Sequence, residues 1–506
     1  MKISPSIGEF LKYSANKNLV VFSYKFFCDY LSPLSIFYRI ARFAKEESFL
    51  LESVEGEEKI SRFSFIGFSP LAIFKSKDRN INIYIDGKHR KFVASKDPLY
   101  ELKKVMATFH HWPKENIRFF GGFVGYLGYD FVKYCEPVGE PQKDDLGSFD
   151  VYFILPKFLI IFDHLIKQIE ILSFLHLVDR KNLKKIYSKE VRSLEEVVSY
   201  IIAPVKLPFL NLPNTKEVRI LSKKKVLNLK SNFKKSSFIK AVEKAKKYIK
   251  EGEIIQVVLS QRFKIKFSGD PFLVYRYLRL LNPSPYMYYL NFKGIKIVGS
   301  SPEMLLRCEK KLLITRPIAG TRRRGRSEDE DNLLEKELLA DPKERAEHIM
   351  LVDLGRNDLG RVAKKGTVKV PIFMSIERFS HVMHIVSEVR GNLNNNQNIF
   401  SALRACFPAG TVTGAPKVRA MQIINELEPN RRGIYAGCIG YFSFTNSLDT
   451  CIIIRTIIFK DSKAYVQAGA GIVADSKPKA EYKETVNKAS AQILALKLAR
   501  PKAQIR

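Results

Sequence analysis

Acidic side chains near the C-terminus have the spacing of a cation site. Glu481 and Glu484 are three residues apart in a segment with helical spacing, so both carboxylates face one side of that helix. Glu347 lies in a second predicted helix, beside His348. Mg²⁺ prefers such oxygen ligands and leaves positions open for substrate oxygens. The alternative for Glu481 and Glu484 is a surface ladder with neighbouring lysines, and the sequence alone does not show whether the two helices meet.

Glycine-containing segments offer backbone N–H groups to an anion. Residues 410–417 read GTVTGAPK, which lacks the spacing of a nucleotide phosphate loop but precedes a predicted helix. Residues 469–474 read GAGIVA, a weak match to the dinucleotide fingerprint, because no helix start and no suitably placed acidic residue follow. Gly320 and Thr321 form a similar turn before three arginines. These segments indicate close approach of the backbone to a ligand.

One arginine and two histidines complete the candidate chemistry. Arg455 occurs in the apolar run 451–459, so its guanidinium needs a buried anionic partner, either protein or ligand. His381 and His384 occur in a predicted strand that places them on opposite faces, so a shared metal is not expected and one could transfer a proton. Together the residues predict an enzyme whose small anionic substrate is held partly through Mg²⁺, without identifying the reaction.

Composition limits the class of protein. The chain has 506 residues, 46% hydrophobic and 27% charged, which is typical of a globular protein of about two to four domains. The net charge of +33 is compatible with nucleic-acid binding, but the basic residues are spread along the chain and no finger or aromatic strand motif occurs. We expect no nucleic-acid partner, and a basic field would also attract a small anion.

Targeting signals and cysteine spacing indicate a cytoplasmic protein. No apolar stretch reaches the ~18 residues that a membrane span requires, and the N-terminus lacks a secretory pattern. We therefore expect no membrane partner. The six cysteines are scattered without a CxxC pair, which predicts isolated thiols in a reducing compartment.

The first 205 residues read as short strands separated by turns. Residues 80–93 form a hairpin signal around Asp86-Gly87, and residues 149–155 and 158–162 are strand-like on either side of Pro156. Residues 183–202 have helical spacing.

Residues 206–230 carry prolines, asparagines and lysines typical of a linker, and residues 231–500 alternate helices with strands. The predicted helices are 238–251 (capped by Ser237), 271–281, 341–358 (capped by Asp341), 416–427 and 477–498. The predicted strands are 253–263, 285–291, 296–300, a hairpin over 304–315, 382–390 and three strands between 437 and 467. Strands in consecutive pairs favour an α+β fold.

Several of these segments resemble the chorismate-utilising enzymes, and most closely the component I group of the anthranilate synthases. The matching segments are 317–321, 346–358, 380–384, 410–417 and 467–475, with shorter patches at 50–53, 62–67 and 121–130. The similarity is dense over residues 231–497. The resemblance implies an α+β fold with two large, mostly antiparallel β-sheets packed together and helices outside.

The resemblance also implies roles for individual residues. It places Mg²⁺ on Glu347 and Glu484 with Glu481 nearby, in place of the surface ladder. The residues implied to bind chorismate are Gly320, Thr321, Tyr435, Arg455, Gly469, Ala470 and Gly471. The residues implied to lie by the ring, near the departing C4 hydroxyl, are His384, Thr411 and Glu303.

The implied reaction converts chorismate and ammonia to anthranilate and pyruvate, the first step of tryptophan biosynthesis. Isochorismate and salicylate synthases are similar but place a lysine base where this chain has Gln256. Aminodeoxychorismate synthases, the alternative, typically read PIKGT, and Ala319 replaces that lysine here. Both positions favour the anthranilate reaction.

Regulation and assembly are implied as well. Tryptophan is expected to inhibit by binding between an N-terminal region, residues 1–205, and a chorismate-binding region, residues 231–500. The matching residues are Ser53, Pro285, Tyr286 and Met287, although residues 282–285 could simply be a turn. Because little chain follows the last matching helix, we expect a separate glutamine amidotransferase subunit (anthranilate synthase component II) to deliver ammonia in a heterotetramer.

Overall fold

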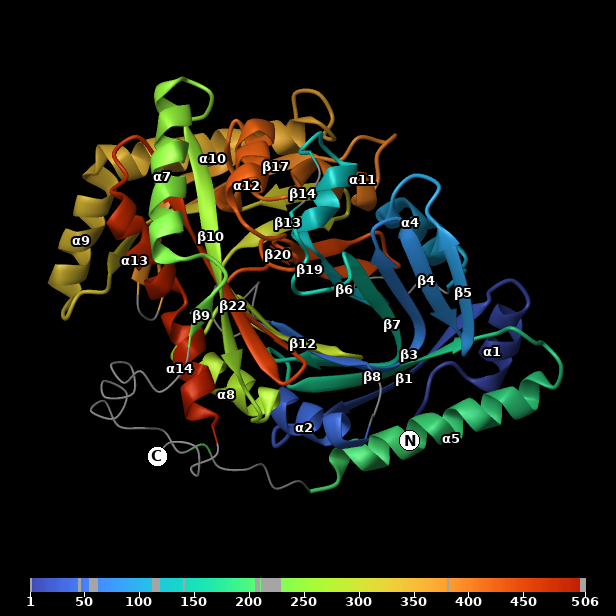
Figure 1. Cartoon of the computed structure of the whole chain (residues 1–506). Helices are drawn as coiled ribbons and strands as arrows, with labels where there is room; N and C mark the ends of the chain where they lie inside the picture. Colours follow the sequence, from blue (N-terminus) through green and yellow to red (C-terminus); the bar gives the residue numbers. More distant parts are fainter. Residues whose placement is uncertain are drawn as a thin grey trace.

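The computed structural model (Figure 1) describes residues 2–43, 47–53, 62–111, 119–139, 142–204, 210, 229–379 and 382–500. The predicted linker falls mainly outside the described residues, and so does His381. Among the described helices, none is both long and apolar enough to cross a bilayer. All six cysteines are free thiols, as predicted.

The strands are β1 (Leu19–Phe27), β2 (Ser48–Glu52), β3 (Phe63–Lys77), β4 (Asn80–Ile85), β5 (Lys88–Val93), β6 (Gly122–Leu127), β7 (Val151–Asp163), β8 (Gln168–His176), β9 (Lys230–Ser231), β10 (Gln256–Lys266), β11 (Tyr286–Phe292), β12 (Ile295–Ser301), β13 (Met304–Glu309), β14 (Leu312–Thr315), β15 (Ile318–Arg323), β16 (Lys369–Arg378), β17 (Val382–Asn392), β18 (Gly414–Ala415), β19 (Cys438–Ser443), β20 (Leu448–Ile452), β21 (Thr456–Lys460) and β22 (Lys463–Ile472). The helices are α1 (Ile7–Ser14), α2 (Pro33–Phe43), α4 (Pro98–Ala107), α5 (Leu183–Ile202), α7 (Lys235–Lys250), α8 (Pro271–Leu281), α9 (Glu328–Ala340), α10 (Pro342–Gly360), α11 (Ile399–Cys406), α12 (Lys417–Leu427), α13 (Pro478–Lys488) and α14 (Ser490–Leu498), with 3-10 turns η1 (Tyr129–Tyr134) and η2 (Gly410–Val412).

Antiparallel pairing joins these strands into one long ladder. It runs through β10, β22, β21, β12, β11, β2, β3, β7, β6, β19, β20, β13, β14 and β17. Four strands of the N-terminal part thus connect two strand sets of the C-terminal part, through the β2–β11 and β6–β19 pairs. Figure 1 shows the helices around this sheet, so the predicted α+β class is confirmed.

Two large hydrophobic cores lie on opposite faces of the sheet. Successive residues of β7 alternate between them, with Leu159 and Ile161 in one core and Ile160 in the other. The same alternation separates Tyr288 from Tyr289 on β11. Strands buried on both faces explain the apolar runs that the sequence shows.

Local signals predicted many of the elements correctly. The hairpin β4–β5 forms, and α5 and α8 have the predicted bounds. Helix α10 begins as predicted, because the Asp341 carboxylate accepts hydrogen bonds from the backbone N–H groups of Lys343 and Glu344.

Four local predictions were wrong. Strand β7 continues through Pro156, which lies opposite Pro70 beside a bulge. Helix α7 begins at Lys235, ahead of the predicted cap at Ser237. Four strands, β19 to β22, replace the predicted three, because Arg455 has a φ of 53° and turns the chain between β20 and β21. The closing helix is interrupted at Ala489, which separates α13 from α14.

Candidate active site

A cavity of about 690 Å³ brings most of the predicted site residues together. We call it the substrate cavity. Its lining includes Glu303, Gly320, Thr321, Glu347, His384, Thr411, Tyr435, Arg455, Gly469, Gly471, Glu481 and Glu484. Residues from distant parts of the C-terminal half therefore meet in one place, although no short sequence segment contains them.

Ala470 is the exception among the predicted chorismate-binding residues. Strand β22 alternates, so Gly469 and Gly471 line the cavity while Ala470 is fully buried in an apolar core on the other face. A Cβ at Gly469 would lie 3.0 Å from the Tyr435 hydroxyl and 2.9 Å from a methyl group of Val258. Glycine therefore keeps this wall of the cavity open.

His384 is held in one tautomer by the turn that carries Gly320. Its Nδ1 atom lies 2.8 Å from the Gly320 carbonyl oxygen and 3.0 Å from Oγ1 of Thr321. A carbonyl oxygen only accepts, so Nδ1 carries the proton and Nε2 is the nitrogen left for a ligand. Burial lowers the pKa of His384, which favours the neutral ring.

Glu303 is a buried carboxyl group at the edge of the same cavity. Burial raises its pKa to about 8, and the Thr411 hydroxyl and the Ile318 backbone N–H only partly offset this. The Glu303 carbonyl oxygen accepts a hydrogen bond from the Ile452 N–H, which ties it to β20. At neutral pH the side chain is therefore protonated and has a proton to give.

Helices α10 and α13 both present carboxylates to the cavity. Glu347 comes from α10, and Glu481 and Glu484 come from α13. Burial chiefly raises the pKa of Glu347 and of Glu481, and neighbouring carboxylates add to both shifts. Glu484 also forms an ion pair with Lys488 at 2.6 Å, so one contact of the surface-ladder alternative exists too. Among the described residues, no three such side chains are already gathered as a metal cluster.

Arg455 projects from the turn between β20 and β21 rather than from a strand. Its Nη1 atom donates to the Lys488 carbonyl oxygen at 3.0 Å. No described carboxylate forms an ion pair with it, and burial lowers its pKa. The Glu484 carboxylate attracts the Arg455 guanidinium without forming an ion pair with it, so Arg455 can also bind an anion in the cavity.

Some cavity residues were not identified from the sequence. Gln467 lines the cavity and donates to Oγ of Ser260 at 2.8 Å. It lies two and four residues before Gly469 and Gly471, so the alternation of β22 would have indicated it. Lys343 lies one helical turn before Glu347 on α10 and also lines the cavity.

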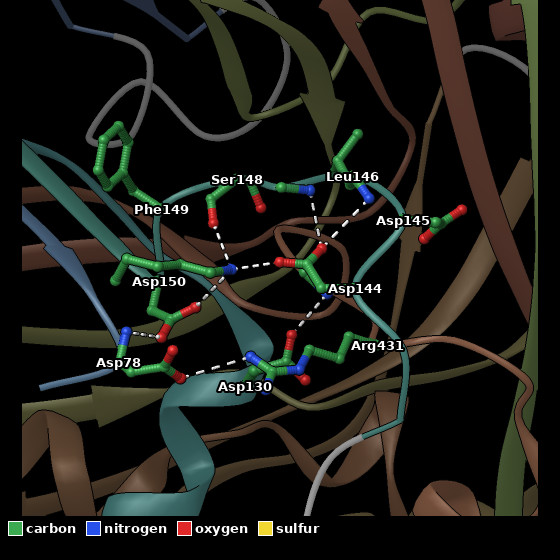
Figure 2. A network of polar contacts seen from close by, with 12 residues as sticks. Asp78, Asp130, Asp144, Asp145, Leu146, Ser148, Phe149, Asp150 and Arg431 are labelled. Carbon is green, nitrogen blue, oxygen red and sulfur yellow. Dashed lines mark hydrogen bonds and ion pairs between the residues drawn. The ribbon is translucent and has the colours of Figure 1, made fainter.

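A polar network connects the N-terminal part to the segment before Tyr435 (Figure 2). The Asp130 carboxylate accepts a hydrogen bond from the Gly433 N–H at 2.8 Å, and Arg431 lies 3.5 Å from Asp78. Burial raises the pKa of Asp130 to about 6. The network thus positions the chain that delivers Tyr435 to the substrate cavity.

Next to this network lies the buried ion pair of Arg432 and Glu428, 2.7 Å apart. Arg432 also donates to the carbonyl oxygens of Val258 and Val412, at 2.6 and 2.7 Å. Both valines line the substrate cavity. The pair therefore holds two walls of the cavity from behind.

A second, smaller cavity contains all four residues matched to tryptophan inhibition. Ser53, Pro285, Tyr286 and Met287 line it together with residues of β13, β19 and β20. We call it the small cavity. The Tyr286 hydroxyl donates to Asp449 at 2.9 Å, and the Ser53 hydroxyl has no hydrogen-bond partner among the described residues.

Comparisons with known proteins agree with this arrangement. A family model described as chorismate binding enzyme matches residues 46–494. Anthranilate synthase component 1 of Aquifex aeolicus is 46% identical and covers 99% of both chains. The corresponding protein of Acetivibrio thermocellus is 46% identical and covers 97% of this chain and 98% of its own.

Solved structures of related enzymes are also similar to this chain. Anthranilate synthase component I from Streptococcus pneumoniae superposes with a TM-score of 0.74 at 38% identity, over 87% of this chain and 94% of that one. The menaquinone-specific isochorismate synthase from Escherichia coli, at 20% identity and a TM-score of 0.70, shares the fold. The chain therefore belongs to the chorismate-binding enzymes, among relatives that are anthranilate synthase component 1 proteins.

Proposed function

We propose that the chain converts chorismate and ammonia to anthranilate, pyruvate and water in the substrate cavity. Ammonia adds at C2 as the C4 hydroxyl leaves, and the enolpyruvyl group then departs as pyruvate. The observation that carries the proposal is that Gln256 and Ala319 both line this cavity. Neither side chain can act as the amine base or amine nucleophile of the related reactions, so free ammonia is the nucleophile. An aminodeoxychorismate synthase is the less favoured alternative.

The polar groups of the cavity suit a dicarboxylate with a hydroxyl group. Arg455 forms no ion pair with a described carboxylate and can clamp a substrate carboxylate in bidentate fashion. Gly469 and Gly471 let the substrate approach the backbone of β22. The protonated Glu303 can give the leaving C4 hydroxyl the proton that it needs, because hydroxide is a poor leaving group, and His384 Nε2 can accept a hydrogen bond and so orient the substrate.

The carboxylates of the cavity fit a magnesium ion whose remaining ligands come from substrate and water. Mg²⁺ typically uses one or two protein carboxylates beside substrate oxygens, so Glu347 and Glu484 would suffice, with Glu481 nearby. The Glu484 carboxylate adds to the rise in the pKa of both Glu347 and Glu481, so the three side chains lie close enough to repel one another, which supports this assignment. The ion would hold a chorismate carboxylate when bound.

Two further parts of the proposal concern the partner and the inhibitor. The relatives are named component 1, which supports a second component. We propose that this is a glutamine-hydrolysing component II that supplies ammonia within a heterotetramer. Tryptophan would bind the small cavity, to which residues 1–205 contribute Ser53 and residues 231–500 contribute Pro285, Tyr286 and Met287.

The experiment supplies the pure chain with chorismate, Mg²⁺ and ammonium at alkaline pH and follows anthranilate fluorescence. We expect product with ammonium, none after chelation and none with glutamine alone. Isochorismate or aminodeoxychorismate as product would overturn the assignment of Gln256 and Ala319. If the chain is inactive with ammonium, the assay is repeated with a component II subunit and glutamine, and failure there contradicts the proposal.

A further inference from the structure

A short hydrogen-bond chain links the small cavity to the substrate cavity. Tyr288 lines the small cavity, and its hydroxyl lies 2.6 Å from Oγ1 of Thr456. The Thr456 hydroxyl donates its single proton to the Ile454 carbonyl oxygen at 2.7 Å, so Tyr288 must be the donor to Thr456. Burial raises the pKa of Tyr288, which keeps that proton in place.

The hydrogen-bond chain ends on the turn that carries Arg455. Ile454 lines the substrate cavity, and Arg455 follows it with a φ of 53°. A left-handed backbone at a residue other than glycine persists only where its surroundings hold it. Here the Arg455 carbonyl oxygen accepts a hydrogen bond from the Ser300 N–H at 3.3 Å. On the other side of the turn, the Thr456 hydroxyl donates a hydrogen bond to the Ile454 carbonyl oxygen.

The Tyr288 ring is fixed by its neighbours rather than by its hydroxyl alone. Gly299 of β12 lies opposite Tyr288 in the β11–β12 pair. A Cβ at Gly299 would lie 2.1 to 2.4 Å from three atoms of the Tyr288 side chain, so only glycine admits the ring there. A displacement of β11 therefore moves the Tyr288 hydroxyl with it.

We propose that Tyr288 is a positioning residue that couples occupation of the small cavity to the placement of Arg455. The inference rests on the proposed function, in which tryptophan binds the small cavity and Arg455 binds a chorismate carboxylate. The small cavity measures about 70 Å³, one tenth of the substrate cavity, so a ligand with an indole ring has to widen it. Widening displaces Tyr288, frees Thr456 and releases the Ile454–Arg455 turn.

The test removes single hydroxyl groups from this hydrogen-bond chain. Tyr288→Phe deletes only the donating hydroxyl, and Thr456→Val deletes the middle link. Tyr289→Phe is the matched control, because it makes the same change one residue along β11 on the opposite face. Thr456→Ser keeps the hydroxyl and serves as the rescue variant. Each protein is assayed for kcat and KM for chorismate with and without saturating tryptophan, and tryptophan binding is measured by calorimetry.

The coupling predicts a specific pattern. Without tryptophan, Tyr288→Phe and Thr456→Val raise the KM for chorismate about fivefold, the effect of one lost hydrogen bond, with kcat changed less than about twofold. The factor by which tryptophan lowers kcat/KM falls by a similar amount, and the calorimetric Kd for tryptophan falls by up to about the same factor, because binding no longer has to break the bond between Tyr288 and Thr456. The double variant shows no further loss, because both changes break one chain. Thr456→Ser and Tyr289→Phe behave as wild type.

Other outcomes distinguish failure of the proposed coupling from failure of the proposed function. Wild-type inhibition and wild-type KM in Tyr288→Phe and Thr456→Val would overturn the coupling while leaving the proposed function intact. A loss in Tyr289→Phe equal to that in Tyr288→Phe would also overturn it, since packing rather than the chain would be responsible. A wild-type protein that forms no anthranilate would instead refute the proposed function.

Discussion

Gln256 donates a hydrogen bond from its side-chain amide to Oε1 of Glu347 over 3.3 Å. The position that separates this chain from the related synthases thus touches one of the carboxylates assigned to magnesium. The contact lowers the pKa of Glu347, which burial otherwise raises. Gln256 therefore helps to keep Glu347 ionised as well as removing an amine from the cavity.

Glu347→Gln should raise the Mg²⁺ concentration for half-maximal activity at least tenfold, because a neutral amide is a weaker ligand for a hard cation. Activity is measured against Mg²⁺ concentration. Glu344→Gln is the matched control, since Glu344 lies one turn earlier on α10, also lines the cavity, and is paired with Arg322 at 3.2 Å. Equal effects of the two variants would contradict the assignment of Glu347.

The pH profile should report Glu303. Its pKa of about 8 means that the side chain is protonated below pH 8 and loses its proton above it. If it donates that proton to the leaving hydroxyl, kcat/KM expressed per free ammonia is level below about pH 8 and falls above it. Glu303→Gln should remove this limb and lower kcat by about 10²-fold or more. A profile that rises through pH 8 would contradict the role as donor.

The same shift predicts a change in stability. The ordinary pKa of a glutamate side chain, which applies to the unfolded chain, is 4.5, so between about pH 4.5 and 8 the folded chain holds a proton that the unfolded chain has lost. The contribution of Glu303 to the free energy of unfolding therefore falls as pH rises through this range. The melting temperature of Glu303→Gln minus that of wild type should therefore be larger at pH 9 than at pH 5.

Ser53→Phe should abolish tryptophan inhibition, because the larger side chain fills the small cavity. Turnover of chorismate should remain measurable without tryptophan, and calorimetry should detect no tryptophan binding. Inhibition equal to that of wild type would show that tryptophan binds elsewhere.

Arg432→Met should cost about 3–5 kcal/mol of the free energy of unfolding, because it leaves Glu428 charged and buried. The side chains of the two residues are only 1% and 4% exposed. Replacing both, as Arg432→Met with Glu428→Leu, should recover part of the loss. Arg356→Met is the control: its ion pair with Asp353 is more than half exposed and should contribute under about 1 kcal/mol. Denaturant unfolding of all four proteins distinguishes the cases.

Sequence signals that act over a few residues predicted the fold best. The Asp341 cap, the Asp86-Gly87 turn and the helical spacing of residues 183–202 depend on neighbours along the chain, and each formed as predicted. The β2–β11 and β6–β19 pairs join residues more than 200 positions apart, and no local pattern encodes them. The turn at Arg455 was missed because its apolar neighbours read as one continuous strand.

Prediction of the candidate site from the sequence depended on the family resemblance rather than on local signals. The carboxylates of α10 and α13 were visible in the sequence, but only the family resemblance suggested that they meet, and the structure brings them to one cavity. Ala470 was included because the resemblance names the segment rather than one face of β22. The Arg432–Glu428 pair has the i,i+4 spacing of an ordinary surface pair, so nothing in the sequence indicates its burial.

The conversion of chorismate and ammonia to anthranilate is tested most directly with chorismate, Mg²⁺ and ¹⁵N-labelled ammonium, with the products identified by mass spectrometry. We expect labelled anthranilate and pyruvate in equal amounts, and loss of both when Arg455 is replaced by methionine. An unlabelled product, or a labelled product that retains the enolpyruvyl group, would contradict it.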